Sequence, residues 1–198
     1  MKYTLMIDTS SSILYVGLAK NGEIINEIIE LDTKNHSIAV MPAIKTVLNG
    51  VKPDQIIVAA GPGSYTGLRI GVVTAKTLAY AYGVPLYAVS SLEVVAASYA
   101  KEGELVASVQ DARRGNVYAT LYQDGKVIAP DALVERASLP ENARVLENLA
   151  PKGAAFLKLA KEPVENVLTF EPRYLKLVEA EEKWLENNTG TGDYVTRK

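Results

Sequence analysis

The sequence predicts an α/β protein built from two lobes that each begin with β-strands. Three short strand-like stretches occupy the first 31 residues, and apolar helices alternate with strands after them. A second group of strand-like stretches begins near Gly103, which favours an internally duplicated fold. A chain of 198 residues suits one large domain or two small ones. We therefore predict an N-terminal lobe over residues 1–102 and a smaller C-terminal lobe over residues 103–198.

Turn residues separate the predicted elements of the first lobe. Asn21-Gly22 indicates a two-residue hairpin, because both central positions of a type I′ turn need positive φ. A glycine-rich loop from Gly61 to Gly67 connects a buried strand to a long helix. The predicted strands are Lys2–Ile7, Ile13–Ala19, Glu23–Leu31, Gln55–Ala60 and Leu86–Ser90, and the predicted helices are Ile38–Leu48, Leu68–Tyr82 and Ser91–Lys101.

The second lobe has fewer clear elements. Glu104–Gln110 and Asn116–Tyr122 are predicted strands, and Asp124-Gly125 turns the chain into a third strand, Lys126–Ala129. Only weak helical segments follow from Ser138 onward. An amphipathic helix is predicted from Pro172 to Glu186, and residues 187–198 have the composition of a loose polar tail.

Composition excludes several kinds of chemistry. The chain has no cysteine and a single histidine, His36, so a disulfide framework, a thiolate nucleophile and a zinc site of Cys or several His ligands are excluded. Magnesium held by carboxylates stays open. The apolar stretches are far shorter than the roughly 18 residues that span a bilayer, and the N-terminus has no signal-peptide pattern. We expect a cytoplasmic protein that does not contact a membrane.

The charge of the chain bears on nucleic-acid binding. The net charge is −2, and the longest basic run is Arg113-Arg114. A protein that holds RNA by itself needs a basic face, because phosphate neutralisation supplies most of the affinity. If the chain serves RNA chemistry, we expect it to reach the RNA only indirectly, through a partner.

Two segments resemble parts of nucleotide-binding sites. Gly61-x-Gly63-x-x-x-Gly67 differs from the dinucleotide motif in its last gap, and it is not a P-loop because the Gly-Lys-Ser/Thr ending is missing. Asp8, Thr9 and Ser10 follow the first strand, where a carboxylate and hydroxyls suit a metal and a phosphate. The alternative is structural in both segments: glycines allow close packing of a strand and a helix, and Asp, Thr and Ser are ordinary turn residues.

Other polar residues point to weaker hypotheses. A serine hydrolase would have to combine Ser64 with His36, but Ser64 lacks the G-x-S-x-G surroundings of such a nucleophile. The segment from Asp111 to Gly115 either binds an anion or pairs Asp111 with Arg113 across a turn. The residues leave that choice open.

The two helices Ile38–Leu48 and Leu68–Tyr82 are apolar on nearly all sides. A helix on a sheet buries one face, so its other face needs a cover, and a second subunit is the simplest cover in a short chain. Burial by the second lobe is the alternative. The predicted partner interface consists of Ile38, Met41, Lys45, Leu48, Tyr65, Leu68, Arg69, Val72, Val73, Lys76 and Tyr80.

Four motifs in a fixed order resemble those of the TsaB (YeaZ) family. They are LMIDTS at 5–10, GPGSYTGLRIG at 61–71, DARRGNVY at 111–118 and PRYL at 172–175. The resemblance implies an ASKHA (actin/hexokinase/Hsp70-like) fold of two βββαβα-type lobes, the second reduced. It also implies a catalytically silent partner of TsaD that, with TsaE, helps to transfer threonylcarbamoyl to N6 of adenosine 37 in ANN-decoding tRNAs. ATP and metal would belong to TsaD, and the chain would form a homodimer when alone.

The resemblance also implies where a TsaD-like metal site would lie. Its two histidine ligands align with Ser91 and Val95, and valine cannot bind a metal. We therefore expect no catalytic residue, no metal ligand and no cofactor of its own, with Asp8, Thr9 and Ser10 as degenerate phosphate-loop positions. The alternative is a small ATP-binding ASKHA enzyme with its own phosphotransfer or ATPase activity. That enzyme would need a second phosphate loop, and the C-terminal half contains no such motif.

Overall fold

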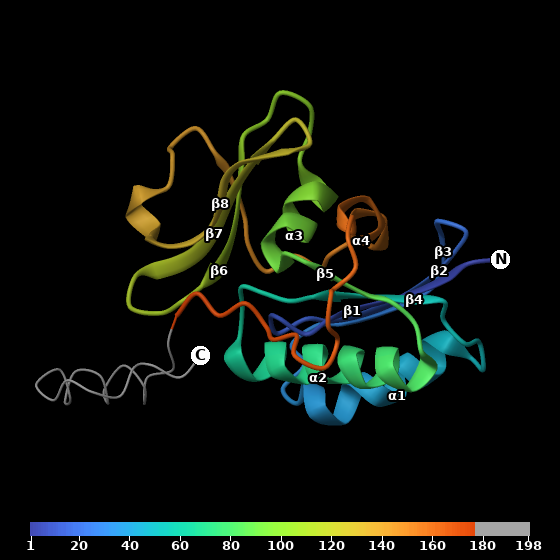
Figure 1. The fold of residues 1–198 in the computed structure, drawn as a ribbon. Coiled ribbons are helices and arrows are strands. Elements are labelled where there is room, and N and C mark those ends of the chain that lie inside the picture. The colour runs from blue at the N-terminus through green and yellow to red at the C-terminus, as the bar shows by residue number, and fades with distance from the viewer. Residues whose placement is uncertain (177–198) are drawn as a thin grey trace, which may run out of the picture.

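Two β-sheets, one in each half of the chain, organise the structure (Figure 1). The computed structural model describes residues 1–176. The first sheet has the strand order β3-β2-β1-β4-β5. β1, β2 and β3 pair antiparallel, whereas β4 and β5 continue the sheet from β1 in parallel. The strands are β1 Tyr3–Asp8, β2 Leu14–Lys20, β3 Glu23–Glu30, β4 Gln55–Ala59 and β5 Leu86–Val89.

Helices cover both faces of this sheet. α1 (His36–Leu48) packs on β2 and β3, and α2 (Tyr65–Tyr82) packs on β1, β4 and β5. Both lie on the same side, below the sheet in Figure 1. α3 (Ser91–Tyr99) and α4 (Gly153–Leu159) lie on the other side, and α3 also contacts the second sheet. The predicted alternation of strands and helices in this half is confirmed.

Local chemistry explains where these elements begin and end. Asn21 and Gly22 have φ values of 51° and 89°, so the predicted hairpin turn is confirmed. Asn49 ends α1 in a left-handed conformation, with φ of 42°. α2 begins three residues before the predicted start, because the Ser64 hydroxyl caps the helix by accepting a hydrogen bond from the Gly67 amide.

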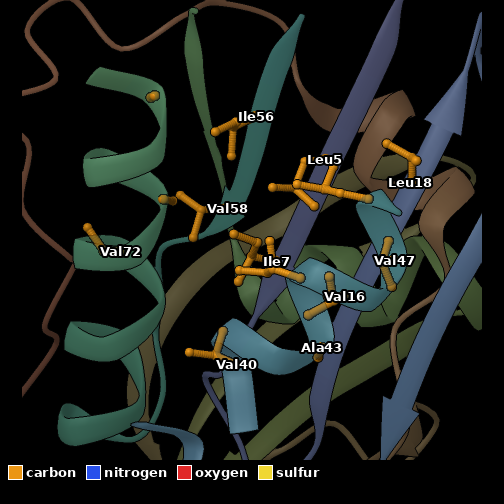
Figure 2. Close-up of a cluster of buried hydrophobic side chains, with 14 of the residues drawn as sticks. Leu5, Ile7, Val16, Leu18, Val40, Ala43, Val47, Ile56, Val58 and Val72 are labelled. Carbon is orange, nitrogen blue, oxygen red and sulfur yellow. The ribbon is translucent and has the colours of Figure 1, made fainter. Parts of the chain in front are cut away.

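The main core lies between the first sheet and the helices α1 and α2. Figure 2 shows side chains of β1, β2 and β4 meeting those of the two helices. Branched residues dominate the strands because β-branched side chains pack well on a pleated surface. The labelled members are Leu5, Ile7, Val16, Leu18, Val40, Ala43, Val47, Ile56, Val58 and Val72.

The second sheet repeats the first in shortened form. Its order, β8-β7-β6-β9, corresponds to β3-β2-β1-β4, again with two antiparallel pairings followed by a parallel one. Where α1 separates β3 from β4, only the 3₁₀ turn η1 separates β8 from β9. This is the predicted α/β architecture with a reduced second lobe. The elements are β6 Val106–Asp111, β7 Asn116–Gln123, β8 Lys126–Glu135, η1 Arg136–Ser138 and β9 Arg144–Leu146.

The C-terminal region differs from the prediction. Pro172–Lys176 is not helical, so the predicted helix does not begin there, and its remainder lies outside the described residues. Residues 163–174 instead form an irregular segment, which we call the C-terminal strap. It runs from α4 past α2 toward the second sheet (orange to red in Figure 1). Its Val164 amide donates to the Leu86 carbonyl, so the strap covers part of the edge strand β5.

Candidate functional site

The loop after β1 lies where the sequence suggested a phosphate site. The carboxyl group of Asp8 is buried and accepts a hydrogen bond of 2.8 Å from the Ser10 amide. Burial raises the pKa of this carboxyl group, and the hydrogen bonds from Ser10 oppose the shift. The Ser10 carbonyl accepts from the Ser64 amide and from the Gln110 side chain, which comes from the second lobe. The loop is therefore fixed by contacts within the chain.

Glycines bring α2 directly against this loop. A Cβ atom at Gly67 would lie 2.1 Å from the Thr9 carbonyl oxygen, and one at Gly71 would lie 2.3 Å from Thr9 Oγ1. A Cβ at Gly63 would lie 2.5 Å from the Ser10 carbonyl oxygen. The Thr9 hydroxyl donates to the Gly67 carbonyl across the contact. The motif thus has the structural role of close packing.

This packing does not fit a bound phosphate. A phosphate loop needs free backbone amides that point at the anion. Here the Ser10 amide donates to Asp8, the Ser64 amide donates to the Ser10 carbonyl, and the Gly67 amide donates to the Ser64 hydroxyl. Thr9 and Ser10 thus hold the start of α2, and Asp8 holds Ser10 within the turn.

The candidate residues for catalysis and metal binding are also engaged elsewhere. His36 bonds the Ser11 carbonyl through Nε2 at 2.8 Å, and Ser64 caps α2. Ser91 Oγ accepts from the Gly61 amide, and Val95 of α3 packs in an apolar cluster that includes Val106 and Tyr122 of the second sheet. Within residues 1–176, no group of three or more His, Cys, Asp or Glu side chains is arranged to hold a metal ion. Over the same residues, no helix is long and apolar enough to cross a membrane.

A cleft of about 610 Å³ opens between the start of α2, the β6–β7 turn and the end of the strap. Asp111 and Arg113 do contact each other across the turn, because the Asp111 carboxylate accepts a hydrogen bond of 3.1 Å from the Arg113 amide. Arg113 and Arg114 both have left-handed backbone conformations, with φ of 65° and 54°. The turn places both arginines on the wall of the cleft.

The outer faces of α1 and α2 carry exposed apolar side chains. Ile38 is 70% exposed on α1, and Val73 and Tyr80 are 58% and 70% exposed on α2. Met41 and Lys45 are exposed on the same side of α1 as Ile38, at positions i+3 and i+7. On α2, Tyr65, Arg69, Val73, Lys76 and Tyr80 form one stripe. The two helices pack beside each other, so their exposed side chains belong to one surface, which we call the helix-pair face.

Three residues of the predicted interface point the other way. Leu48, Leu68 and Val72 are buried in this chain, and Val72 is only 1% exposed, so the expectation that they are open to solvent is wrong. Leu68 and Val72 lie on the side of α2 that also buries Ala75 and Ala79 against the sheet. Because α2 is apolar over more than half its surface, its sequence alone does not identify this side.

The strap supplies part of the cover that was assigned to a partner. Lys76 Nζ donates to the carbonyls of Leu168 and Phe170, at 3.0 and 2.5 Å. Strap residues Val164, Val167 and Phe170 pack against the main core. Their spacing of three residues is the one sequence signal that an apolar contact exists in this segment.

Arg173 connects the strap to both lobes. Its amide donates to the Ala60 carbonyl at the end of β4, and its guanidinium forms an ion pair with Asp131 of β8. Burial raises the pKa of Glu93 on α3, and the nearby charge of Arg173 acts against that shift. The sequence analysis missed this connection, since residues 42 positions apart in an irregular segment and a strand show no common pattern.

Comparisons with known proteins agree with this structure. A family model described as TsaD, tRNA N6-adenosine threonylcarbamoyltransferase, matches residues 23–184. The tRNA threonylcarbamoyladenosine biosynthesis protein TsaB of Bacillus subtilis is 38% identical over 225 aligned residues, which cover 92% of this chain and 98% of the relative. The TsaB protein of Escherichia coli is 35% identical over 126 residues, or 60% of this chain and 54% of the relative.

A solved structure extends the match to three dimensions. YeaZ from Pseudomonas aeruginosa superposes with a TM-score of 0.76 at 26% sequence identity, covering 88% of this chain and all of that one. The expected ASKHA-type architecture is thereby confirmed, with the second lobe reduced as described above. By its sequence over nearly its whole length, and by its fold, the chain belongs to the TsaB (YeaZ) family of tRNA threonylcarbamoyladenosine biosynthesis proteins.

Proposed function

We propose that this chain is a non-catalytic subunit that binds a TsaD protein through the helix-pair face. In that role it supports the transfer of threonylcarbamoyl to N6 of adenosine 37 in ANN-decoding tRNAs. The family supplies the reaction, since the Bacillus subtilis relative is a tRNA threonylcarbamoyladenosine biosynthesis protein. The observation that supports the binding surface is the set of exposed apolar side chains on two adjacent helices.

The physical argument for this surface is the cost of leaving it in water. Burying an apolar side chain contributes about 25 cal/mol per Å² of area removed from water. Ile38, Met41, Val73 and Tyr80 are exposed on one side of the molecule. Lys45 and Arg69 are exposed on the same two helices. Surfaces that combine apolar and charged side chains in this way are typical of subunit interfaces.

The remaining partners follow from the same role. TsaE joins in the assembled complex, and the ATP and the metal ion are held by TsaD rather than by this chain. The net charge of −2 favours an indirect hold on the tRNA, mainly through TsaD. The protein acts in the cytoplasm. In the absence of TsaD, two copies cover the helix-pair face in a homodimer, which sedimentation at high micromolar concentration would detect.

The second candidate is a small ATP-dependent enzyme of the same fold. It would use Asp8, Thr9 and the glycine-rich loop to hold the nucleotide. The close approach of Gly67 and Gly71 to Thr9 counts against it, because α2 packs against the loop and the amides of Ser10, Ser64 and Gly67 already donate within the chain. Calorimetry with magnesium-ATP tests this point: micromolar affinity for the pure chain would favour the enzyme.

The binding surface is tested by placing a charge on it. Val73→Glu puts a carboxylate on the helix-pair face, which would be buried without a partner charge on association. We expect the affinity for TsaD to fall about a hundredfold or more and the melting temperature to stay unchanged. Ile128→Glu is the matched control, because Ile128 is 57% exposed against 58% for Val73 but lies on β8 of the second lobe.

The outcomes separate the surface from the fold. Loss of TsaD binding and of tRNA modification in Val73→Glu, with both retained in Ile128→Glu, supports the proposal. Normal TsaD binding by a folded Val73→Glu protein would place the interface elsewhere.

A further inference from the structure

The cleft between the lobes combines side chains that are far apart in the sequence. Tyr65 comes from the first turn of α2, Tyr118 from β7 and Tyr174 from the strap. Arg113 and Arg114 from the β6–β7 turn and Lys176 from the end of the described chain line the same space. The fold thus brings Lys176 to the same cleft as Arg113 and Arg114 and forms a small basic surface that no single stretch of the sequence shows.

Its chemistry suits an aromatic base joined to a phosphate. Bases stack on tyrosine rings, and arginine binds phosphate through paired N–H donors. The rings of Tyr65 and Tyr174 already lie 4.7 Å apart, with Arg69 5.4 Å from the centre of Tyr65. Asp111 also lines the cleft, and its carboxylate accepts a hydrogen bond from the Arg113 amide. A volume of about 610 Å³ is within the range of pockets that hold small organic molecules.

A nucleotide could reach this cleft free in solution or as part of an RNA strand. A free triphosphate is commonly held by a phosphate loop and a metal ion, but the loop after β1 packs directly against α2, and the cavity beside Asp8 and Ser10 has only about 30 Å³. Residues 1–176 also hold no group of three metal-ligating side chains. A single phosphodiester needs neither, and two adjacent arginines beside tyrosine rings resemble the stacking and charge arrangement of single-stranded RNA sites.

We propose that this cleft binds an unpaired nucleotide of the tRNA substrate while the chain is part of the TsaD complex. The inference rests on the proposed function, because the complex supplies most of the affinity and this chain adds one local contact. It modifies the expectation that the chain reaches tRNA only indirectly. Arg113 and Arg114 hold the phosphate, and Tyr118 presents its ring to the base.

The test measures tRNA affinity of the reconstituted complex over a range of salt concentrations. The variant Arg113→Asn/Arg114→Asn removes both charges, and asparagine tolerates the left-handed backbone at these positions. Each lost phosphate contact lowers the slope of log affinity against log salt by about 0.7 on a single strand. Because the two arginines share one phosphate, we expect the slope to decrease by about 0.7. Tyr118→Leu keeps apolar bulk, and we expect affinity to fall about fivefold or more without a change in slope.

The matched control is Lys20→Asn/Lys52→Asn, which removes the same charge. Lys20 lies opposite Tyr3, the first residue of β1. Lys52 lies two residues before Asp54, whose amide donates to the Tyr3 carbonyl. Both lysines are therefore at the end of the first sheet that is opposite the cleft. We expect this variant to keep the wild-type slope. A slope as steep in the arginine variant as in the control overturns the proposal.

Two further measurements distinguish an RNA site from a free-nucleotide site and from a defect in complex assembly. The first is competition with fluorescent tRNA by micromolar AMP. If AMP lowers the tRNA affinity of the wild-type complex but not that of the complex with Arg113→Asn/Arg114→Asn, the cleft is a free-nucleotide site and the RNA assignment is overturned. Pull-down of TsaD by each variant reports complex formation independently. If even the wild-type chain fails to bind TsaD, the proposed function fails. If all variants bind TsaD and the arginine variant keeps the wild-type salt slope, the cleft proposal alone fails.

Discussion

Two adjacent valines of α2 allow burial to be measured without a change in chemistry. Val72 is 1% exposed and packs in the main core, whereas Val73 is 58% exposed on the helix-pair face. Replacing either by alanine removes the same two methyl groups and gains the same helix propensity. The propensity terms cancel between the two variants. The difference in their free energies of unfolding therefore reports the burial of the side chain.

The expected difference follows from the size of the deleted groups. Each buried methyl or methylene contributes about 0.8 kcal/mol, so two contribute about 1.6 kcal/mol before any cavity is counted. With incomplete collapse of the site we expect Val72→Ala to be less stable than Val73→Ala by about 2 kcal/mol. For a chain of this length that corresponds to a melting temperature lower by roughly 4–8 °C.

The assay is urea denaturation of the full chain, followed by circular dichroism at several protein concentrations. The concentration series matters because a homodimer through the helix-pair face would add stability to the wild type and to Val72→Ala. At the lowest concentrations Val73→Ala should match the wild type within about 0.5 kcal/mol. Equal stability of the two variants, or a less stable Val73→Ala, would refute the orientation of α2 described here.

Three further predictions concern contacts around the loop and the strap. Burial raises the pKa of Asp8 above its ordinary 3.8. The protonated carboxyl group therefore stabilises the protein fully below the pKa of the unfolded state, and this stability is lost as the pH rises through the pKa of the folded state. Denaturation curves between pH 4 and pH 8 should show this loss of stability in the wild type but not in Asp8→Asn. Gly71→Ala should destabilise by about 1–3 kcal/mol, despite better helix propensity, because its Cβ would meet Thr9 Oγ1 at 2.3 Å; a raised melting temperature would contradict the close packing. Arg173→Ala should lower the free energy of unfolding by about 2 kcal/mol, because the carboxylate of Asp131 is left buried without its cation. Urea denaturation should show that adding Asp131→Asn to this variant restores most of the lost stability.

Elements with local signals were predictable from the sequence. The hairpin turns at Asn21-Gly22 and Asp124-Gly125 have the positive φ values that their residue types favour. Buried strands such as β1 and β4 also matched, since short apolar runs between turn residues have few alternatives. The start of α2 was placed too late because Gly67 resembles a loop residue. In the structure Gly67 is helical and is required by the approach of Thr9.

The candidate site was less predictable because it depends on contacts between distant segments. The exposed stripes of the helix-pair face were among the predicted residues, but hydrophobic periodicity did not separate Val73 from Val72. The strap forms no helix or strand, so its spacing of apolar residues at Val164, Val167 and Phe170 does not correspond to a regular element. The cleft unites Tyr65, Tyr118 and Tyr174 only after the two lobes have come together.

The course of the strap also determines when the protein can finish folding during synthesis. Residues 163–173 cover β5 and α2, which the ribosome makes some eighty to a hundred residues earlier. While the nascent chain is still growing, the edge of the first sheet and the side of α2 around Lys76 are without their cover. A chain released early would expose that surface. Translation must therefore pass the PRYL motif before the strap can cover the first lobe, so the N-terminal lobe depends on residues made about a hundred positions after it begins to form.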